Sequence, residues 1–117
     1  MNESLSRATR RIVFVAAPGT EILDLVGPLQ VFARASEIFA RQNPGASPIY
    51  SVEVVTTSPH RSLVANCGLR IMAHKTFREL RGNIDTLLVA GGSAVENDEV
   101  SSEVIRGLKT NPAGRSR

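Results

Sequence analysis

The sequence predicts an α/β fold, a flavodoxin-like three-layer sandwich with a mainly parallel sheet. Two runs, residues 12–17 and 86–90, are apolar almost throughout, which is typical of strands covered on both faces. After the first run the apolar residues take helical spacing from Ile22 to about residue 41, and a β-branched run follows at 50–57. Strand, helix and strand in this order predict one βαβ unit and therefore a parallel sheet.

Composition limits the domain count, the location and the cysteine chemistry. At 117 residues, 42% of them hydrophobic, the chain has room for one domain of ordinary globular composition. No apolar run approaches the ~20 residues that span a bilayer, and the first seven residues lack the apolar region of a signal peptide. We therefore expect a cytoplasmic protein without membrane contact. The single cysteine, Cys67, excludes an internal disulfide and any multi-cysteine metal site.

The net charge of +3 does not predict nucleic-acid binding, because many of the cations lie in the terminal segments. Residues 12–108 hold eight cations against ten acids, so the body of the chain is mildly acidic. With no Trp and one Tyr, it offers neither a phosphate-tracking face nor a stacking platform. We expect that these residues do not themselves contact DNA.

Asp24 is the first candidate site residue. Pro28 has no N–H for the carbonyl of Asp24, and its ring crowds that carbonyl. We therefore expect the helix to kink or restart near Asp24, which places its carboxylate at the carboxyl end of the first strand, where open α/β sheets keep their ligand crevice. The alternative is that the Asp24 carboxylate caps the restarted helix. The two roles are compatible.

Turn residues, β-branched runs and apolar spacing predict the remaining elements. They are a flexible tail (1–10), a loop (43–48), an edge ribbon of two short strands (63–66 and 69–73), a helical turn (76–80) and a last helix built on Val100, Val104, Ile105 and Leu108. The strand at 86–90 is expected in the centre of the sheet, beside the first strand. The alternation calls for a further strand after the last helix, so we expect residues 11–117 to be the front portion of one domain.

Gly91 and Gly92 are the second and third candidate site residues. They follow a buried strand and offer backbone N–H groups unshielded by side chains, as an oxyanion hole or a carboxylate-binding loop requires. The alternative is a tight turn that needs positive φ. No phosphate-binding glycine motif is present.

The cysteine and the histidines are weaker candidates. Cys67 lies in the predicted ribbon without a base near it in sequence, so a small packed residue is the favoured interpretation. His60 and His74 lack a carboxylate spacing that would indicate a metal site and are expected on the surface. We expect neither a metal nor a cofactor.

Three stretches, residues 13–19, 22–32 and 85–92, together resemble the ThiJ/PfpI superfamily, which has a glutamine-amidotransferase-like fold. More narrowly, residues 24–32 match an Asp-Leu-x-Gly-Pro-x-x-Val-Phe helix and residues 85–92 an Asp-Thr-Leu-Leu-Val-x-Gly-Gly strand. Both are typical of the N-terminal sensor domain of AraC-type transcriptional regulators. The resemblance runs from about Arg11 to Leu108.

The resemblance implies a role for each site residue. In enzymes of the superfamily a carboxylate at the position of Asp24 hydrogen-bonds a cysteine on a strand-to-helix elbow, and amides of the pair matching Gly91 and Gly92 face the same pocket. The elbow would follow Arg117, and Cys67 does not match it, so no nucleophile carries over. The helix-turn-helix of AraC-type regulators would also lie beyond these residues.

Three functions are therefore open. The first is a non-catalytic, dimerising sensor domain of an AraC-type regulator, with a small polar effector or none near Asp24. The second is the front half of a superfamily enzyme, such as an isonitrile hydratase or related hydrolase. The third is an α/β scaffold for self-association. In each case, too few covering elements should leave apolar surface on the 86–90 strand exposed, which predicts a homodimer or a swapped arrangement.

Overall fold

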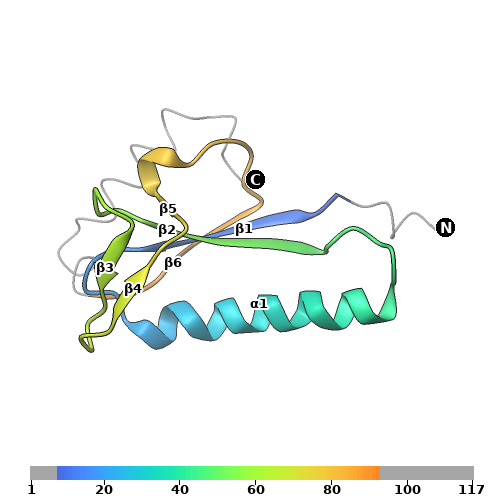
Figure 1. The fold of residues 1–117 in the computed structure, drawn as a ribbon, viewed down its shortest axis with the longest axis horizontal. Helices are drawn as coiled ribbons and strands as arrows, with labels where there is room; N and C mark the ends of the chain where they lie inside the picture. The colour runs from blue at the N-terminus through green and yellow to red at the C-terminus, as the bar shows by residue number, and fades with distance from the viewer. Residues whose placement is uncertain (1–7, 93–117) are drawn as a thin grey trace.

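The computed structural model describes residues 8–92, in which four parallel strands form one sheet in the order β5-β2-β1-β6 (Figure 1). The elements are β1 (Arg10–Ala16), α1 (Ile22–Gln42), β2 (Tyr50–Thr56), β3 (Ser62–Val64), β4 (Arg70–Met72), β5 (Lys75–Thr76), the 3-10 turn η2 (Phe77–Glu79) and β6 (Thr86–Val89). The predicted α/β fold with a parallel sheet is confirmed. The helix predicted around Val104 lies outside the described residues.

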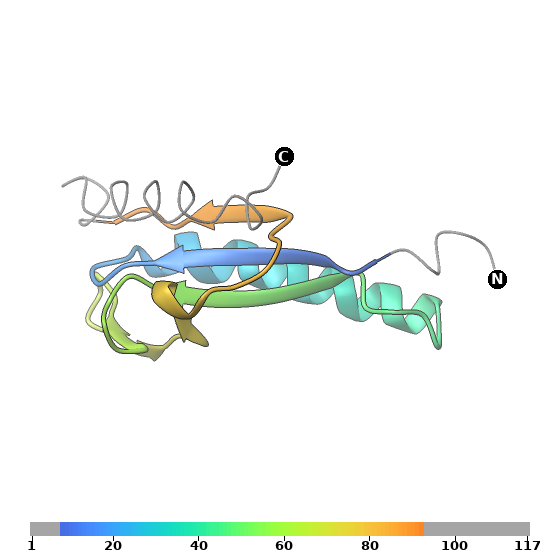
Figure 2. The ribbon, with the colours of Figure 1, turned by 90° about the horizontal axis from the view of Figure 1, so that it is seen from above.

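β1 is the central strand of this sheet. It pairs in parallel with β2 over its whole length and with β6 from Ile12 to Val15, and it lies between these two strands when the sheet is seen from above (Figure 2). Its side chains alternate between two apolar clusters, with Val13 and Val15 on one face and Ile12 and Phe14 on the other. A strand covered on both faces needs apolar residues at successive positions, and residues 12–17 provide them.

α1 covers one face of the sheet (Figures 1 and 2). Leu25 is buried, and Leu29 and Phe32 pack against the same cluster. The ring of Phe32 meets Phe14 edge-on at 6.1 Å between centroids and Tyr50 at 5.0 Å. Edge-to-face pairs of this kind fix the helix laterally over β1 and β2.

The predicted restart of the helix near Asp24 is wrong, because α1 is a single helix that contains Pro28. Asp24 and Pro28 are both exposed. The carbonyl of Asp24 receives no hydrogen bond from Pro28, which has no N–H. It lies in an exposed part of the helix, where water has access. Apolar contacts from Leu25 on one side of Pro28 and from Leu29 and Phe32 on the other hold both segments to the sheet.

The opposite face of the sheet is covered by the segment around η2, above the sheet in Figure 1. Phe77, Leu80 and Ile84 pack there against Val13, Val15 and their neighbours on β2 and β6. η2 confirms the helical turn predicted at 76–80, and it begins with a capping box between Thr76 and Glu79. The strand β5, only two residues long, was not predicted.

β3 and β4 pair antiparallel as a separate two-stranded ribbon, in agreement with the predicted pair of short strands. Leu63, which pairs with Ile71, is buried in the cluster under α1, whereas Val64 and Met72 are exposed. Backbone hydrogen bonds from Gly19 to Val64 and from Asn66 to Thr20 join the ribbon to the turn before α1.

β6 pairs with β1, as predicted, but within residues 8–92 it is the terminal strand and not a central one. Val89 is 44% exposed, which agrees with the expected apolar surface on this strand. The tail boundary also shifts, because Arg10 already pairs with Tyr50 and is held by the carbonyl of Ile49. Within the described range, α1 and the other helical segment are not long and apolar enough to cross a membrane.

Candidate functional site

The turn between β1 and α1 forms the floor of the candidate site. The chain leaves β1 through Ala17, whose carbonyl accepts the N–H of Thr20 at 3.0 Å, and Gly19 takes φ +87°. Thr20 is 2% exposed. Glu21 is the N-cap residue of α1, although its side chain makes no capping hydrogen bond. The strand therefore passes into the helix through a tight turn at the carboxyl edge of the sheet, where ligands of open α/β sheets bind.

Asp24 lies in the first turn of α1, three residues after the N-cap. The interpretation of Asp24 as the cap of a restarted helix is therefore wrong. Its backbone N–H bonds to the carbonyl of Glu21 at 3.1 Å. Its carboxylate is exposed and has no hydrogen-bond or ion-pair partner among residues 8–92. A negative charge in the first turn of a helix interacts favourably with the helix dipole.

Gly91 and Gly92 lie against this turn, immediately beyond β6. The carbonyl of Gly91 accepts the N–H of Glu21 at 2.7 Å and the hydroxyl of Thr20 at 3.3 Å, and Thr20 forms an isolated antiparallel bridge with Gly92. The structure thus brings Asp24, Gly91 and Gly92 together, as the sequence predicted.

Both glycines are required by close approach. A β-carbon on Gly91 would lie 2.9 Å from Oδ2 of Asp24, and one on Gly92 would lie 2.5 Å from the carbonyl oxygen of Gly19. Gly92 also has φ +155°. The alternative interpretation was a turn that needs positive φ. Gly92 has positive φ and also lies in close contact with the turn at Gly19. The absence of a side chain at Gly91 leaves the space that the Asp24 carboxylate occupies.

The ribbon supplies a third side of the site, which sequence reasoning missed. Asn66 donates its backbone N–H to the carbonyl of Thr20 at 2.8 Å and its side-chain amide to Oε1 of Glu21 at 3.1 Å. The N–H of Gly19 bonds to the carbonyl of Val64 at 2.8 Å. Only the folded position of the ribbon reveals these contacts, because no motif in the sequence links Asn66 to a turn more than forty residues earlier.

Cys67 and the histidines do not join the site. Cys67 is a free, exposed thiol at the tip of the ribbon, not the small packed residue that was favoured. His60 and His74 are both exposed, and Nδ1 of His74 accepts the backbone N–H of Val54 at 2.9 Å. Within residues 8–92 no three His, Cys, Asp or Glu side chains are grouped so that they could hold a metal ion.

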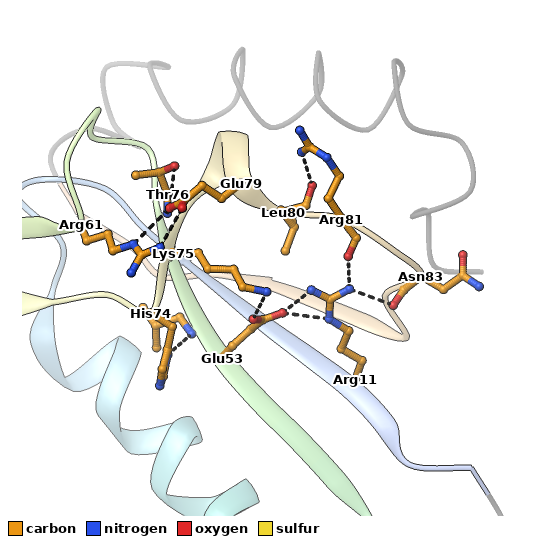
Figure 3. Close-up of polar contacts among 11 residues, drawn as sticks. Arg11, Glu53, Arg61, His74, Lys75, Thr76, Glu79, Leu80, Arg81 and Asn83 are labelled. Atoms are coloured by element: carbon orange, nitrogen blue, oxygen red, sulfur yellow. Dashed lines mark hydrogen bonds and ion pairs between the residues drawn. The ribbon is translucent and has the colours of Figure 1, made fainter.

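A second polar cluster lies away from the candidate site, around Glu53 on β2 (Figure 3). Glu53 accepts hydrogen bonds from both Nε and a terminal nitrogen of Arg11, and Nζ of Lys75 lies 3.0 Å from its other oxygen. Arg11 also donates to the carbonyls of Arg81 and Asn83. Burial raises the pKa of Glu53. The hydrogen bonds and charges of Arg11 and Lys75 together lower it by more, so the pKa of Glu53 lies below its ordinary value.

The Arg61–Glu79 pair is a further ionic contact that lies away from Asp24. Arg61 binds both carboxylate oxygens, at 3.1 and 2.7 Å, and the N–H of Thr76 donates to Oε1 at 2.8 Å. These hydrogen bonds, the one from Arg61 first, lower the pKa of Glu79 to about 2. Both ionic contacts tie loops to the sheet or to each other, and neither involves Asp24.

Comparison with protein-family models gives no match, and neither does comparison with curated proteins. Among solved structures, oxidised DJ-1 from Toxoplasma gondii superposes with a TM-score of 0.66 at 16% identity, over 87% of this chain and 50% of that one. A putative protease I from Bacteroides thetaiotaomicron gives 0.67 at 16% identity, over 87% and 56%. A ThiJ/PfpI family protein from Pseudomonas syringae gives 0.66 at 19% identity, over 97% and 44%.

These likenesses concern the fold, because the sequence identities are low. The chain spans about half the length of the structures it matches. In each of those proteins, the part that superposes on this chain therefore belongs to a longer chain. The described residues have the same α/β fold as these DJ-1 and ThiJ/PfpI structures, with Asp24, Gly91 and Gly92 at one edge of the sheet.

Proposed function

We propose that this chain is the ligand-sensing and dimerising domain of a cytoplasmic AraC-type transcriptional regulator, itself non-catalytic. The effector is a small polar molecule that binds in the crevice beside Asp24. One observation carries the proposal: the Asp24 carboxylate lies against Gly91 at the carboxyl edge of the sheet, exposed and without a partner among residues 8–92. The helix and strand motifs at 24–32 and 85–92, which resemble those of AraC-type sensor domains, support the same assignment.

An ionised carboxylate only accepts hydrogen bonds. A ligand that pairs with Asp24 must therefore donate, and the amine or amide N–H of a small metabolite is the matching group. The Asn66 side chain, already bonded to Glu21, lies beside the same turn without adding charge. The chemistry favours ligands that carry a primary amine or amide.

A non-catalytic role fits the position of the described thiol. Cys67 is an exposed thiol at the tip of the ribbon and does not match the elbow cysteine of the superfamily enzymes. In the proposed regulator, DNA is contacted by a C-terminal helix-turn-helix beyond these residues, and the mildly acidic body of the chain has no part in it.

The second candidate is the front half of a ThiJ/PfpI-type enzyme. The contact between Asp24 and Gly91 favours it, because a carboxylate beside such a glycine pair is the arrangement implied for enzymes of the superfamily. In that case Asp24 orients a cysteine supplied by a later part of the chain.

The decisive experiment is to read the source gene past the codon for Arg117. The proposal expects an open frame that continues into the rest of the α/β domain and then a helix-turn-helix. A frame that instead encodes an elbow cysteine with a partner histidine, and stops after one domain, would replace the regulator by the enzyme.

Ligand binding is tested on the 117-residue chain itself. In a thermal-shift screen of amines, amides and amino acids, we expect at least one compound to raise the unfolding temperature, and Asp24→Asn to abolish that shift. Ser51→Ala, an exposed position on β2, is the matched control and should retain it. A shift of equal size in Asp24→Asn would remove Asp24 from the site.

A further inference from the structure

The side chain of His74 takes the place of a strand residue at the outer edge of β2. His74 lies between β4 and β5, and its imidazole lies beside β2 (Figure 3). Its backbone N–H donates to the carbonyl of Val54 at 2.9 Å, and its Nδ1 accepts the N–H of Val54 at 2.9 Å. The next two residues of β2, Val55 and Thr56, pair with β5. His74 thus satisfies both backbone groups of Val54 at the point where the β2–β5 pairing begins.

This hydrogen bond exists in only one protonation state of the imidazole. A ring nitrogen that accepts an N–H carries no proton, so the single proton of the neutral ring is on Nε2. A second proton turns Nδ1 of His74 into a donor that faces another donor, the N–H of Val54. Two donors cannot form a hydrogen bond. Histidine is the side chain that ordinarily changes charge between pH 5 and 8, so this contact depends on pH in that range.

The charged groups on the elements around His74 do not compensate for the lost bond. The carboxylates on β2, η2 and α1 are already held by cations of their own. They are Glu53 with Arg11 and Lys75, Glu79 with Arg61, and Glu37 with Arg34 and Arg41. Within residues 8–92 His74 has no ion pair with a carboxylate. Because His74 is exposed, its protonated ring can turn away from β2 into water.

His74 also stands at the base of the β3–β4 ribbon. It follows Ala73, whose N–H bonds to the carbonyl of Arg61 at 2.8 Å and closes the ribbon at this end. At the other end of the ribbon, the carbonyl of Val64 and the N–H of Asn66 bond to the turn before α1. The contact between His74 and Val54 therefore fixes one end of the ribbon to the sheet, while the other end lies against the candidate site.

We propose that His74 is a pH-sensitive latch. The neutral ring holds the segment between β4 and β5 on β2, and protonation releases this segment and loosens the ribbon where it bonds to the turn of the candidate site. This inference goes beyond the proposed function and does not rest on it, because it requires neither an effector nor a helix-turn-helix.

The first test is the tautomer of His74, read from long-range ¹H–¹⁵N NMR spectra of the 117-residue chain at slightly alkaline pH. We expect a proton on Nε2 and a bare Nδ1. His60 is the control in the same spectrum, because its ring has no hydrogen-bond partner among residues 8–92, and we expect it to exchange between both tautomers. A His74 ring with its proton on Nδ1 would overturn the proposal.

The second test is the protection of backbone amides from hydrogen exchange, corrected for the intrinsic exchange rate, at slightly alkaline and at mildly acidic pH. In the wild type we expect the protection of the Val54 amide to fall roughly three- to tenfold on acidification, as for the loss of one hydrogen bond. The protection of the Asn66 amide, which bonds to Thr20, should fall with it.

Variants of the two histidines separate the latch from a general effect of acid. In His74→Asn, Oδ1 lies as many bonds from the backbone as Nδ1 of histidine and does not titrate, so protection at Val54 should stay high at both pH values. His74→Ala should give low protection at both. His60→Asn is the matched control and should retain the wild-type fall. Far-UV circular dichroism verifies that each variant folds.

Protection at Val54 that is the same at both pH values in the wild type, or that still falls in His74→Asn, would overturn the latch. A fall at Val54 without one at Asn66 would overturn the link to the candidate site. These outcomes are independent of the thermal-shift screen and of the gene beyond Arg117, which test the proposed function.

Discussion

At the carboxyl ends of β1 and β6, backbone groups make most of the contacts and the Asp24 carboxylate is left to solvent, whereas around Glu53 charged side chains make the contacts. Glu53 is bound by Arg11 and Lys75 and is mostly buried. Asp24, of the same charge, has no partner among residues 8–92. In this fold, paired charges join strands and loops. The acidic group at the crevice is positioned by backbone geometry and stays available for a ligand.

The backbone contacts of the crevice should be the most sensitive part of the molecule. Gly92→Ala would place a β-carbon 2.5 Å from the Gly19 carbonyl oxygen and 2.8 Å from the Cα of Thr20. Because backbone atoms cannot move aside as a flexible side chain can, we expect a loss of roughly 2–4 kcal/mol in the free energy of unfolding, measured by urea titration.

Gly45→Ala is the control for this substitution. Gly45 also has positive φ, +85°, but a β-carbon there meets no atom within 4 Å. The loss in the free energy of unfolding of Gly45→Ala should be limited to the conformational strain, about 1–2 kcal/mol. Equal losses in the two variants would mean that the close approach at Gly92 does not matter.

Glu53→Gln should have the next largest effect. It removes the charge that neutralises Arg11 and Lys75 in a partly buried cluster, so we expect roughly 1–3 kcal/mol less stability at neutral pH. The pKa of Glu53 is lowered by folding, so its contribution is present above the unfolded value of 4.5 and is lost as the pH falls through the folded value. The stability difference between wild type and variant should therefore shrink below pH 4.5. A difference that does not shrink as the pH falls below 4.5 would contradict this role.

The Arg61–Glu79 pair should affect the pKa of Glu79 more than the free energy of unfolding, since exposed ion pairs contribute little to stability. The bonds from Arg61 and Thr76 lower the pKa of Glu79 to about 2, so the carboxyl carbon should titrate near that pH by NMR. In Arg61→Gln we expect the pKa of Glu79 to rise toward its ordinary 4.5, without reaching it, because the Thr76 bonds remain. A Glu79 carboxyl that titrates near 4.5 in the wild type would show that these contacts do not persist in solution.

Asp24→Asn should have the smallest effect on folding. The carboxylate is exposed and unpaired among residues 8–92, so the change in stability should stay within about 0.5 kcal/mol. A loss of several kcal/mol in urea titration would mean that Asp24 is structural. The crevice would then resemble the Glu53 cluster.

Much of the fold followed from local pattern. The buried strands were predicted because a strand covered on both faces must be apolar at successive positions, and residues 12–17 are. The proximity of Asp24 to Gly91 and Gly92 was predictable too, because the carboxyl ends of neighbouring parallel strands lie at one edge of the sheet. Both predictions depend only on short stretches and on the rules of sheet topology.

The remaining features depend on contacts between distant residues. The place of Asn66 beside Glu21 follows from the packing of the ribbon, and the Arg11–Glu53 pair follows from the register of β1 on β2. A strand as short as β5 has too few residues to show a period. The helix restart predicted near Asp24 was wrong because the local effect of Pro28 was outweighed by packing on both sides of it.

Amide NMR tests most directly whether ligands bind at the carboxyl edge of the sheet. The 117-residue chain is titrated with the amines, amides and amino acids of the thermal-shift screen. A binding compound should move the Asp24, Gly91 and Gly92 signals, leave those of Arg11 and Glu53 in place, and have no effect on Asp24→Asn. Signals that move only around Glu53, or equally in Asp24→Asn, would contradict it.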